Sequence, residues 1–343
     1  MAAAAGRREQ ARGGGMTRGF LLGKFMPPHL GHVALCDFAR AYCDELTVLV
    51  CTRPSEPIDG TARFAWMREL CPGARVVHYD REVPQEPSEH PDFWDIWRGI
   101  ARAAHPEAID FVFASEEYGA RLAHELRADF VPFDPKRLTL PVSATQVRDD
   151  PFAAWRFLPP PVRAHYVKTV CLHGPESTGK STLSAALAAH FDTVAAPEYG
   201  RTYCEVFGSE CDEDDLRAIV RGHVAQDFAA RREANKLLVL DTDAVETAVW
   251  ADMLLGRRPA DLDSVARTAD LYLLCDIDVP WTFDGTRYSH LAAMEERKRF
   301  FALCRDELER RRLPYVLVSG PHETRLKTAV DAITARFPEV ATP

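Results

Sequence analysis

The sequence lacks three features that would each assign the protein to a particular class. No stretch approaches the about 20 consecutive apolar residues that a helix needs to cross a bilayer. The nine cysteines contain no C-x-x-C pair, and Cys51, Cys171 and Cys275 lie in apolar runs, which is typical of reduced, buried thiols. Residues 1–8 have no long apolar core and make a poor secretory signal. We therefore expect a cytoplasmic protein with no membrane insertion.

The sequence also lacks the surplus of positive charge that general nucleic-acid binding requires. Lys and Arg number 42 against 51 Asp and Glu, which gives a net charge of −9, whereas binding to a phosphate backbone needs clustered cations. Residues 1–17 are rich in Ala, Gly and Arg and are expected to form a disordered tail. This tail is too short for a helix-turn-helix, so DNA is not an expected partner.

Apolar, β-branched runs alternate with stretches of helical period through most of the 343 residues. The expected strands are 19–25, 46–52, 75–79, 109–114, 166–173, 193–196, 237–241, 271–276 and 315–319. The expected helices include 32–42, 61–70, 180–190, 213–235 and 290–311. This alternation predicts an α/β fold with two doubly wound parallel sheets, which place ligands at the carboxyl ends of their strands.

Three consecutive prolines, Pro159–Pro161, mark the expected boundary between two domains. Consecutive prolines do not continue a helix and favour an extended connector. We therefore assign residues 1–17 to the tail, 18–158 to the first domain and 159–343 to the second. The two halves share an architecture but no motif, so the sequence shows no internal repeat.

The first motif follows the first expected strand and contains two histidines, in the segment Gly23-Lys24-Phe25-Met26-Pro27-Pro28-His29-Leu30-Gly31-His32. If a helix begins here, the spacing places both imidazoles on one side of its first turn, where backbone amides attract phosphate. Donor N–H groups on His29 and His32 could then hold the charge that develops on a triphosphate during nucleotidyl transfer. Taken alone, the two histidines fit an ordinary helix cap equally well.

A second element, residues 142–148, opens another expected helix with small hydroxyl residues and an arginine one turn later. Ser143 and Thr145 can cap the helix and also donate to phosphate oxygens, and Arg148 offers a planar fork of donors. On its own, this segment indicates a good helix start and nothing more.

Together, the H-x-G-H and V-S-x-T-x-x-R segments resemble the nucleotidyltransferase superfamily that these two motifs define. The resemblance covers residues 18–150 and implies transfer of AMP or CMP from ATP or CTP to a phosphate, with no covalent enzyme intermediate. It implies that His29 and His32 contact the triphosphate and that His32 steadies the transition state. The other residues that it places around the nucleotide are Gly23, Lys24, Phe25, Ser143, Thr145 and Arg148.

The second motif, Gly174–Ser181, matches G-x-x-x-x-G-K-[S/T] in full, between an expected strand and an expected helix. Its backbone amides are expected to cradle phosphate, Lys180 to reach the β- and γ-phosphate oxygens, and Ser181 to bind Mg²⁺. Motif and context are both complete, which makes this the most specific signal in the sequence. The expected nucleotide-binding residues are Gly174, Glu176, Ser177, Thr178, Gly179, Ser181 and Thr182.

Acidic residues follow two further strands of the second domain. Asp241 ends the strand 237–241 at the position that orders Mg²⁺ in phosphate-loop enzymes, and Asp243 is a candidate for the same role or for contact with substrate. Glu198 is a candidate base or ribose ligand, and Arg201 a candidate phosphate clamp. The alternatives are aspartates that cap a turn and a surface ion pair between Glu198 and Arg201.

Residues 276–287 are expected to form a flexible lid, in which Arg287 covers the transferring phosphoryl group. Trp281 in that lid, and Trp94 with Trp97 in the first domain, offer aromatic faces for a flat, positively charged heterocycle. Each of these tryptophans fits burial in a core as well as it fits stacking.

The order of the domains, with Pro197–Arg201, Asp241–Asp243 and the lid sequence D-V-P-W-x-x-D-G-x-R, resembles the NadR-type bifunctional proteins over nearly the whole chain. The resemblance implies that the second domain phosphorylates ribosylnicotinamide to nicotinamide mononucleotide. The first domain would then adenylylate the mononucleotide to NAD with release of pyrophosphate, and ATP and Mg²⁺ would serve both steps. Some members carry an N-terminal helix-turn-helix, which we expect this chain to lack. A homo-oligomer is compatible with the resemblance.

Two alternatives remain open at the level of the sequence. In one, the kinase is active and the first domain acts weakly or on another phosphate, such as pantetheine phosphate or glycerol phosphate. In the other, the protein is a module that senses nucleotides or NAD without turning them over. The intact lysine and histidines of the two motifs favour turnover.

Overall fold

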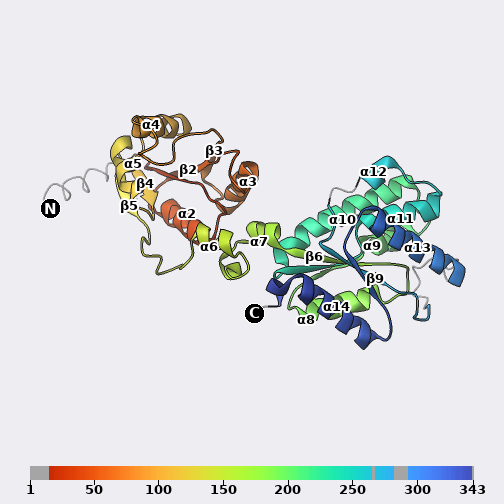
Figure 1. Ribbon diagram of the computed structural model, residues 1–343. Coiled ribbons are helices and arrows are strands. Elements are labelled where there is room, and N and C mark those ends of the chain that lie inside the picture. Colours follow the sequence, from red (N-terminus) through yellow and green to blue (C-terminus); the bar gives the residue numbers. More distant parts are fainter. Residues whose placement is uncertain (1–14, 265–266, 282–292, 342–343) are drawn as a thin grey trace. The chain divides into compact units, whose positions relative to one another are not determined.

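A computed structural model describes residues 15–264, 267–281 and 293–341. The chain divides into two compact units between Val162 and Arg163, and each unit contains a five-stranded sheet flanked by helices (Figure 1). Parallel strands need crossover connections, and these are helices that cover the faces of the sheet. The predicted α/β fold with two doubly wound parallel sheets is confirmed.

The first unit alternates strands and helices along the chain. Its strands are β1 (Arg18–Gly23), β2 (Glu45–Cys51), β3 (Arg75–Tyr79), β4 (Phe111–Ala114) and β5 (Asp129–Pro132). Its helices are α2 (Leu30–Tyr42), α3 (Gly60–Leu70), α4 (Phe93–Ala104), α5 (Tyr118–Leu126), α6 (Ala144–Asp149) and the 3-10 helix η2 (Trp155–Phe157). The strands pair in parallel in the order β3-β2-β1-β4-β5, which places β1 at the centre of the sheet.

Two apolar clusters cover the opposite faces of the first sheet. Phe20 belongs to the cluster beneath α4 and α5, together with Trp97. The next residue of β1, Leu21, belongs to the cluster beneath α2 and α3, together with Met67. Successive side chains of a strand point to opposite faces, so β1 is held on both sides. The turn that follows β1 therefore has a fixed position.

The second unit repeats this architecture with different connections. Its strands are β6 (Lys168–His173), β7 (Ala195–Ala196), β8 (Leu237–Asp241), β9 (Leu271–Cys275) and β10 (Tyr315–Val318). Its helices are α8 (Lys180–His190), α9 (Tyr199–Phe207), α10 (Glu213–Glu233), α11 (Ala244–Leu255), α12 (Ala260–Asp263), α13 (Met294–Arg310), α14 (His322–Arg336) and the 3-10 helix η4 (Pro338–Val340). The parallel order β10-β9-β6-β8-β7 places β6 at the centre.

Two features differ from the sequence-based expectations. The prolines at the boundary do not form an extended connector, because Pro160 and Pro161 begin the helix α7 (Pro160–Tyr166). Proline is compatible with the first turn of a helix, where its missing N–H has no partner to lose. The strand β5 was not expected; it has four residues, ends in Pro132 and lies at a sheet edge, where proline is tolerated.

None of the helices in the described segments combines the length and the apolar character that a bilayer-spanning helix needs.

Candidate functional site

The turn after β1 holds the two histidines of the first motif in a reciprocal cap. His29 is the N-cap of α2, and its Nδ1 accepts the N–H of Gly31 at 3.1 Å. His32 Nδ1 accepts the N–H of His29 at 3.2 Å, and the two rings stack with their centroids 3.8 Å apart. An imidazole that accepts at Nδ1 carries its proton on Nε2 when neutral. Each ring therefore has a donor on the edge away from the backbone.

Burial keeps both of these imidazoles neutral at neutral pH. It lowers the pKa of His29 to about 4, with a further contribution from the charge of Arg137. Burial also holds the pKa of His32 well below its ordinary value, with smaller contributions from His29 and Arg137. The pair therefore offers hydrogen-bond donors and not fixed positive charges, in agreement with the donor role expected from the sequence.

The backbone between the two histidines lies so close to the His29 ring that it requires a glycine, Gly31. A Cβ on Gly31 would lie 2.9 Å from the His29 ring, and one on Gly23 would lie 3.1 Å from the ring of Phe25. Phe25 is buried and meets His32 edge-on at a centroid distance of 5.0 Å. Larger residues at either glycine would displace the rings that form the cap.

A cavity of about 750 Å³ brings the expected residues of the first site together. Residues of the two motifs that line it are Gly23, Lys24, Phe25, His29, His32, Ser143, Thr145 and Arg148. Segments more than 100 residues apart in sequence thus share one wall, because Arg148 Nη1 donates to the carbonyl of Met26 at 2.6 Å across a separation of 122 residues. The other nitrogen, Nη2, donates to Thr145 Oγ1 at 3.1 Å.

Ser143 caps α6 as the sequence predicts. Its Oγ accepts the N–H of Gln146 at 3.2 Å, and Gln146 Oε1 accepts the N–H of Ser143 at 2.8 Å. The exposed end of α6 thus faces the cavity with a complete cap.

Three charged residues of the first site were missed in the sequence. Arg137 lines the cavity and pairs with Glu116 at 3.5 Å. The fully buried Arg63 donates to the carbonyl of Lys24 at 2.9 Å and to Glu56 at 2.7 Å, and Glu56 in turn lies 3.7 Å from Lys24 Nζ. No motif surrounds any of the three, so only the tertiary contacts reveal that they position the first loop.

The tryptophans of the first unit lie in the same cavity wall. Trp97 is packed in the core beneath α4, its Nε1 donates to the carbonyl of Pro84 at 3.0 Å, and it still lines the cavity. Trp94 is half-buried, lines the cavity and lies under the guanidinium of Arg121, 5.4 Å from the ring centroid. Both alternatives weighed for Trp97, core packing and contact with ligand, are therefore compatible with its position.

The phosphate loop of the second motif follows β6. Several of its residues have a positive φ, a backbone conformation that favours glycine. Gly174 has φ +131°, and a Cβ there would lie 2.8 Å from the carbonyl oxygen of Cys275. Gly179 precedes α8 with φ +82°, and Ser177 also has a positive φ, of 60°. Thr178 donates its hydroxyl to the carbonyl of Pro175 at 2.8 Å, which closes the loop.

Lys180 is buried beneath this loop and is held by carbonyls and a carboxylate. Its Nζ donates to Gly174 O at 2.6 Å and to Pro175 O at 3.1 Å, and lies 3.4 Å from Glu246 Oε1. Burial disfavours the charge, but the carboxylates of Glu246, Glu198 and Asp241 together raise the pKa of Lys180 above its ordinary value. Lys180 is therefore a cation at neutral pH.

Glu246 is the residue of this site that sequence reasoning missed. It lies in the first turn of α11, is 1% exposed, and accepts the N–H of Gly174 at 2.8 Å. Burial raises the pKa of Glu246 above its ordinary value, although the charge of Lys180 acts in the opposite direction. No sequence pattern marks Glu246, because it lies three positions after Asp243 inside an apolar helix.

Asp241 at the end of β8 suits a metal ion. It is 3% exposed, and its Oδ1 has no hydrogen-bond partner among the described residues. Ser181 and Thr182 begin α8 with exposed side chains. A buried carboxylate oxygen without a donor, beside a phosphate loop that ends in a hydroxyl residue, fits the oxygen ligands that Mg²⁺ prefers.

Asp243 agrees instead with the alternative of a structural cap. Its Oδ1 accepts the N–H groups of Val245 at 2.9 Å and Glu246 at 3.3 Å, and its Oδ2 accepts the hydroxyl of Tyr272 at 2.7 Å. Both carboxylate oxygens are thus engaged within the fold.

A small cavity of about 60 Å³ lies beside the phosphate loop and contains the other expected residues of the second site. It is lined by Glu176, Glu198 and Arg201, and the last two form an ion pair at 3.8 Å. Glu246 and the half-buried Trp250 complete its wall and were not expected. Trp281 is half-buried at the end of a described segment, and Arg287 lies outside the described residues.

The sequence of this chain is similar to known proteins over most of its length. A family model described as an AAA domain matches residues 169–325. The trifunctional NAD biosynthesis/regulator protein NadR of Escherichia coli (strain K12) is 32% identical over 342 residues, covering 92% of this chain and 82% of that protein. The protein of the same description from Salmonella typhimurium is 31% identical, covering 88% of this chain and 78% of the relative.

Two solved structures share the fold over most of the chain. A crystal structure of NadR protein in complex with NR superimposes with a TM-score of 0.72 at 22% identity, covering 94% of this chain and 96% of that one. A crystal structure of NadR protein in complex with NAD and AMP-PNP gives the same TM-score and identity, covering 94% and 97%.

Proposed function

The chain belongs to the NadR family of NAD biosynthesis proteins, and we propose that it converts ribosylnicotinamide to NAD in two ATP-dependent steps. The second unit is the ribosylnicotinamide kinase and the first is the nicotinamide-mononucleotide adenylyltransferase. The observation that carries this proposal is the presence of two complete phosphate cradles, one after β1 and one after β6, each at the carboxyl edge of its own sheet.

In the kinase step, the 5′-hydroxyl of ribosylnicotinamide attacks the γ-phosphorus of ATP and ADP leaves. Lys180 leaves the loop carbonyls and donates to the β- and γ-phosphate oxygens, where it offsets the charge that develops. Glu198, in the wall of the small cavity, accepts the hydroxyl proton, and Arg201 holds phosphate. Ser181 and Asp241 would hold Mg²⁺, which when bound would neutralise charge on the phosphates.

In the adenylylation step, the phosphate of nicotinamide mononucleotide attacks the α-phosphorus of ATP and pyrophosphate leaves. The Nε2 donors of His29 and His32 hydrogen-bond to the triphosphate as its charge shifts toward the leaving group. Arg148 and the hydroxyls of Ser143 and Thr145 hold the β- and γ-phosphates. The enzyme supplies position and charge, and no residue of the site needs to become covalently attached.

The nicotinamide ring needs an aromatic or apolar wall in each site, because it is flat and carries positive charge. In the first unit, Trp94 and Trp97 share the cavity with the histidines, and we assign the ring to this wall. In the second unit, Trp250 lines the small cavity and joins Trp281 as a candidate. All proposed partners are small molecules in the cytoplasm, since a net charge of −9 gives no support to DNA binding.

One time course tests both steps together. Purified protein receives ribosylnicotinamide, ATP and Mg²⁺, and mononucleotide, NAD, ADP and pyrophosphate are followed by chromatography. We expect mononucleotide first and NAD after a lag, with one pyrophosphate for each NAD formed and with ADP equal to the sum of mononucleotide and NAD. Mononucleotide without NAD would reduce the protein to a kinase. Binding of ATP and NAD without any product would instead support the sensing module.

A further inference from the structure

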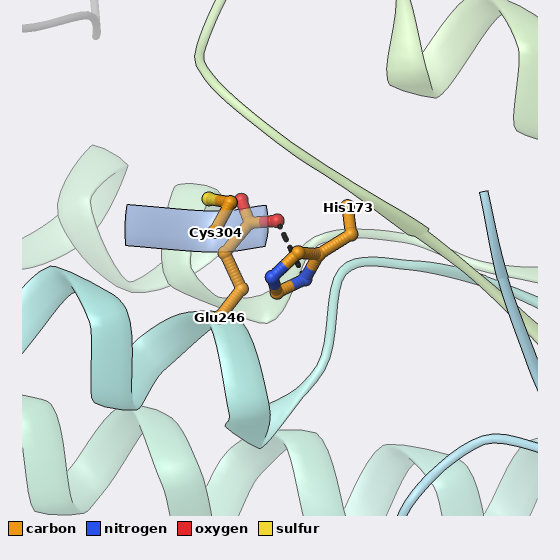
Figure 2. A group of neighbouring side chains, drawn as sticks. All are labelled: His173, Glu246 and Cys304. Atoms are coloured by element: carbon orange, nitrogen blue, oxygen red, sulfur yellow. Dashed lines mark ion pairs between the residues drawn. The ribbon is translucent and has the colours of Figure 1, made fainter. Parts of the chain in front are cut away.

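A buried cluster of three potential ligands lies behind the phosphate loop. His173 ends β6, Glu246 lies in the first turn of α11, and Cys304 lies in α13; their side chains converge in Figure 2. One ligand atom from each residue lies within 4.8 Å of the other two. The exposed fractions are 0%, 1% and 0%, so bulk water does not solvate the cluster.

The imidazole of His173 is not satisfied by the protein. Among the described residues, neither its Nδ1 nor its Nε2 has a hydrogen-bond partner, whereas Glu246 Oε1 lies 3.4 Å from Lys180 Nζ. A buried polar atom without a partner costs about 1–3 kcal/mol, and native proteins leave few of them. Two such atoms on one fully buried ring indicate a bound species that supplies the missing interactions.

The spacing of the nitrogen and oxygen suits a metal ion. His173 Nδ1 and Glu246 Oε2 lie 3.2 Å apart without the geometry of a hydrogen bond. Two ligands on one zinc ion, at bond lengths of about 2.0–2.1 Å and a tetrahedral angle, lie about 3.3 Å apart. A thiolate at about 2.3 Å would lie about 3.6 Å from the nitrogen. A small rotation of Cys304 within the 4.8 Å cluster would complete three ligands.

The charges of the three side chains also favour a metal ion. A carboxylate, a thiolate and a neutral imidazole bring two negative charges, which balance a divalent cation in a site that water does not reach. Lys180 lies 3.4 Å from Glu246 Oε1, and its own charge is also stabilised by Glu198 and Asp241. Sulfur and nitrogen ligands select zinc-like ions, whereas Mg²⁺ prefers oxygen. The site therefore differs in chemistry from the oxygen ligands Ser181 and Asp241.

We propose that His173, Glu246 and Cys304 bind one divalent cation of the zinc class, separate from the Mg²⁺ of the kinase reaction. The ion joins β6, α11 and α13, which otherwise meet here through unsatisfied polar atoms. Glu246 also accepts the N–H of Gly174 at 2.8 Å, so the ion would hold the first residue of the phosphate loop through one carboxylate. Its role is structural, because folding places all three ligands in the interior.

Cobalt provides the test, since it replaces zinc and reports on its ligands. The full chain is produced in medium supplemented with Co²⁺ and then dialysed against excess Mg²⁺, which clears the oxygen site. We expect one cobalt per chain and an intense near-ultraviolet absorption from a thiolate–cobalt bond. X-ray absorption should show one sulfur and at least one imidazole nitrogen in the ligand shell.

Variants separate the cluster from other thiols. Cys304→Ala and His173→Ala should each lose the absorption and at least half of the bound metal. The control is Cys171→Ala, which removes another fully buried thiol from the same unit and should keep both signals. Circular dichroism of each variant checks that it is folded, and the X-ray absorption of the unmodified chain does not depend on any variant.

Two results would overturn the proposal. One is an unmodified, folded chain that holds no stoichiometric metal after growth with zinc or cobalt, in which case internal water satisfies the two nitrogens of His173. The other is a bound ion whose shell lacks sulfur, or whose absorption survives in folded Cys304→Ala. Neither result bears on the kinase and adenylyltransferase assays, so it leaves the proposed function intact.

Discussion

The two phosphate cradles differ in the charge of their main donor side chains, although each cradle lies between a central strand and the helix after it. After β1, two imidazoles stack at 3.8 Å, and burial keeps both neutral. After β6, a buried lysine keeps its charge because three carboxylates surround it. Neutral donors can be packed together without repulsion, whereas a buried cation needs buried anions. The second site is accordingly rich in acids.

This difference in charge explains which other residues line each cavity. In the second unit, Glu198 and Glu246 compensate Lys180 and also line the small cavity, so the same carboxylates serve charge balance and the substrate site. In the first unit, the histidines need no counterion, and two cations of the cavity come from other segments, Arg137 from the loop after β5 and Arg148 from α6. A substitution at one cradle should therefore leave the other unchanged.

Removal of the buried lysine gives the largest expected effect. Lys180→Ala should reduce the kinase kcat/KM about 10³-fold, because a preorganised donor to the transferring phosphate is lost. Conversion of added mononucleotide to NAD should stay within twofold of the unmodified rate. The two reactions are measured separately, with ribosylnicotinamide in one assay and mononucleotide in the other. A parallel loss of both activities would show that the cradles are not independent.

Removal of one imidazole should produce the converse pattern with a smaller loss. His32→Ala should lower NAD formation from mononucleotide about 10²-fold, the usual cost of one transition-state donor. The kinase rate should not change. His124→Ala is the matched control, since that side chain is 81% exposed in the same unit and should retain full activity. Retention of adenylyl transfer by folded His32→Ala would remove the histidines from the proposed mechanism.

The two cradles also show how far the sequence alone could predict the molecule. Local sequence patterns were enough to predict the strand-to-helix turns, the motif residues and the cap at Ser143. Each of these features depends only on neighbours in the chain. Glu246, Arg63 and Trp250 were missed, since each acquires its role through contacts between distant elements, such as the 72-residue separation of Glu246 from Gly174. Asp243 was ambiguous for a related reason: the choice between cap and ligand depended on Tyr272, 29 residues away.

The second unit also uses buried charge for stability, which gives a third prediction. Glu307 in α13 is 3% exposed and accepts from Arg258 at 2.5 Å, Arg310 at 2.8 Å and Arg311 at 2.5 Å. Burial opposes its ionisation, but the three guanidinium groups lower the pKa of Glu307 to about 2. Glu307→Gln should reduce the free energy of unfolding of this unit by about 3 kcal/mol, because it removes the buried anion that the three arginines share and leaves them, among the described carboxylates, only Asp252 and Asp263.

Thermal inactivation measures this effect in each unit separately. The kinase activity of Glu307→Gln should be lost at a lower temperature, while the adenylyltransferase activity keeps its original midpoint. Glu309→Gln lies on the same helix with a side chain that is 55% exposed, so its effect should be within about 0.5 kcal/mol. Equal destabilisation by the two variants would contradict a stabilising role for the buried network.

The smallest expected effect concerns the pH below which the rate of adenylyl transfer falls. A histidine whose folded pKa lies at about 4, below its ordinary 6.5, takes up protons more readily when unfolded. Its contribution to the free energy of unfolding is therefore complete above pH 6.5 and declines as the pH falls toward 4. The rate should follow the same imidazole and remain flat from neutral pH down to about 5.

Arg137→Gln sharpens this last test, because it removes one cation that lowers the pKa of His29 and His32. Burial remains the larger cause, so the acid limb should move upward by less than one pH unit and stay below 6.5. The pH profile of kcat for NAD formation, recorded with saturating ATP and mononucleotide, measures the shift. A limb centred near 6.5 in the unmodified enzyme would mean that burial does not lower the pKa of the imidazoles, and a rate that rises as the pH falls would mean that they act as cations. The contrast between neutral donors in one cradle and a compensated cation in the other would then fail.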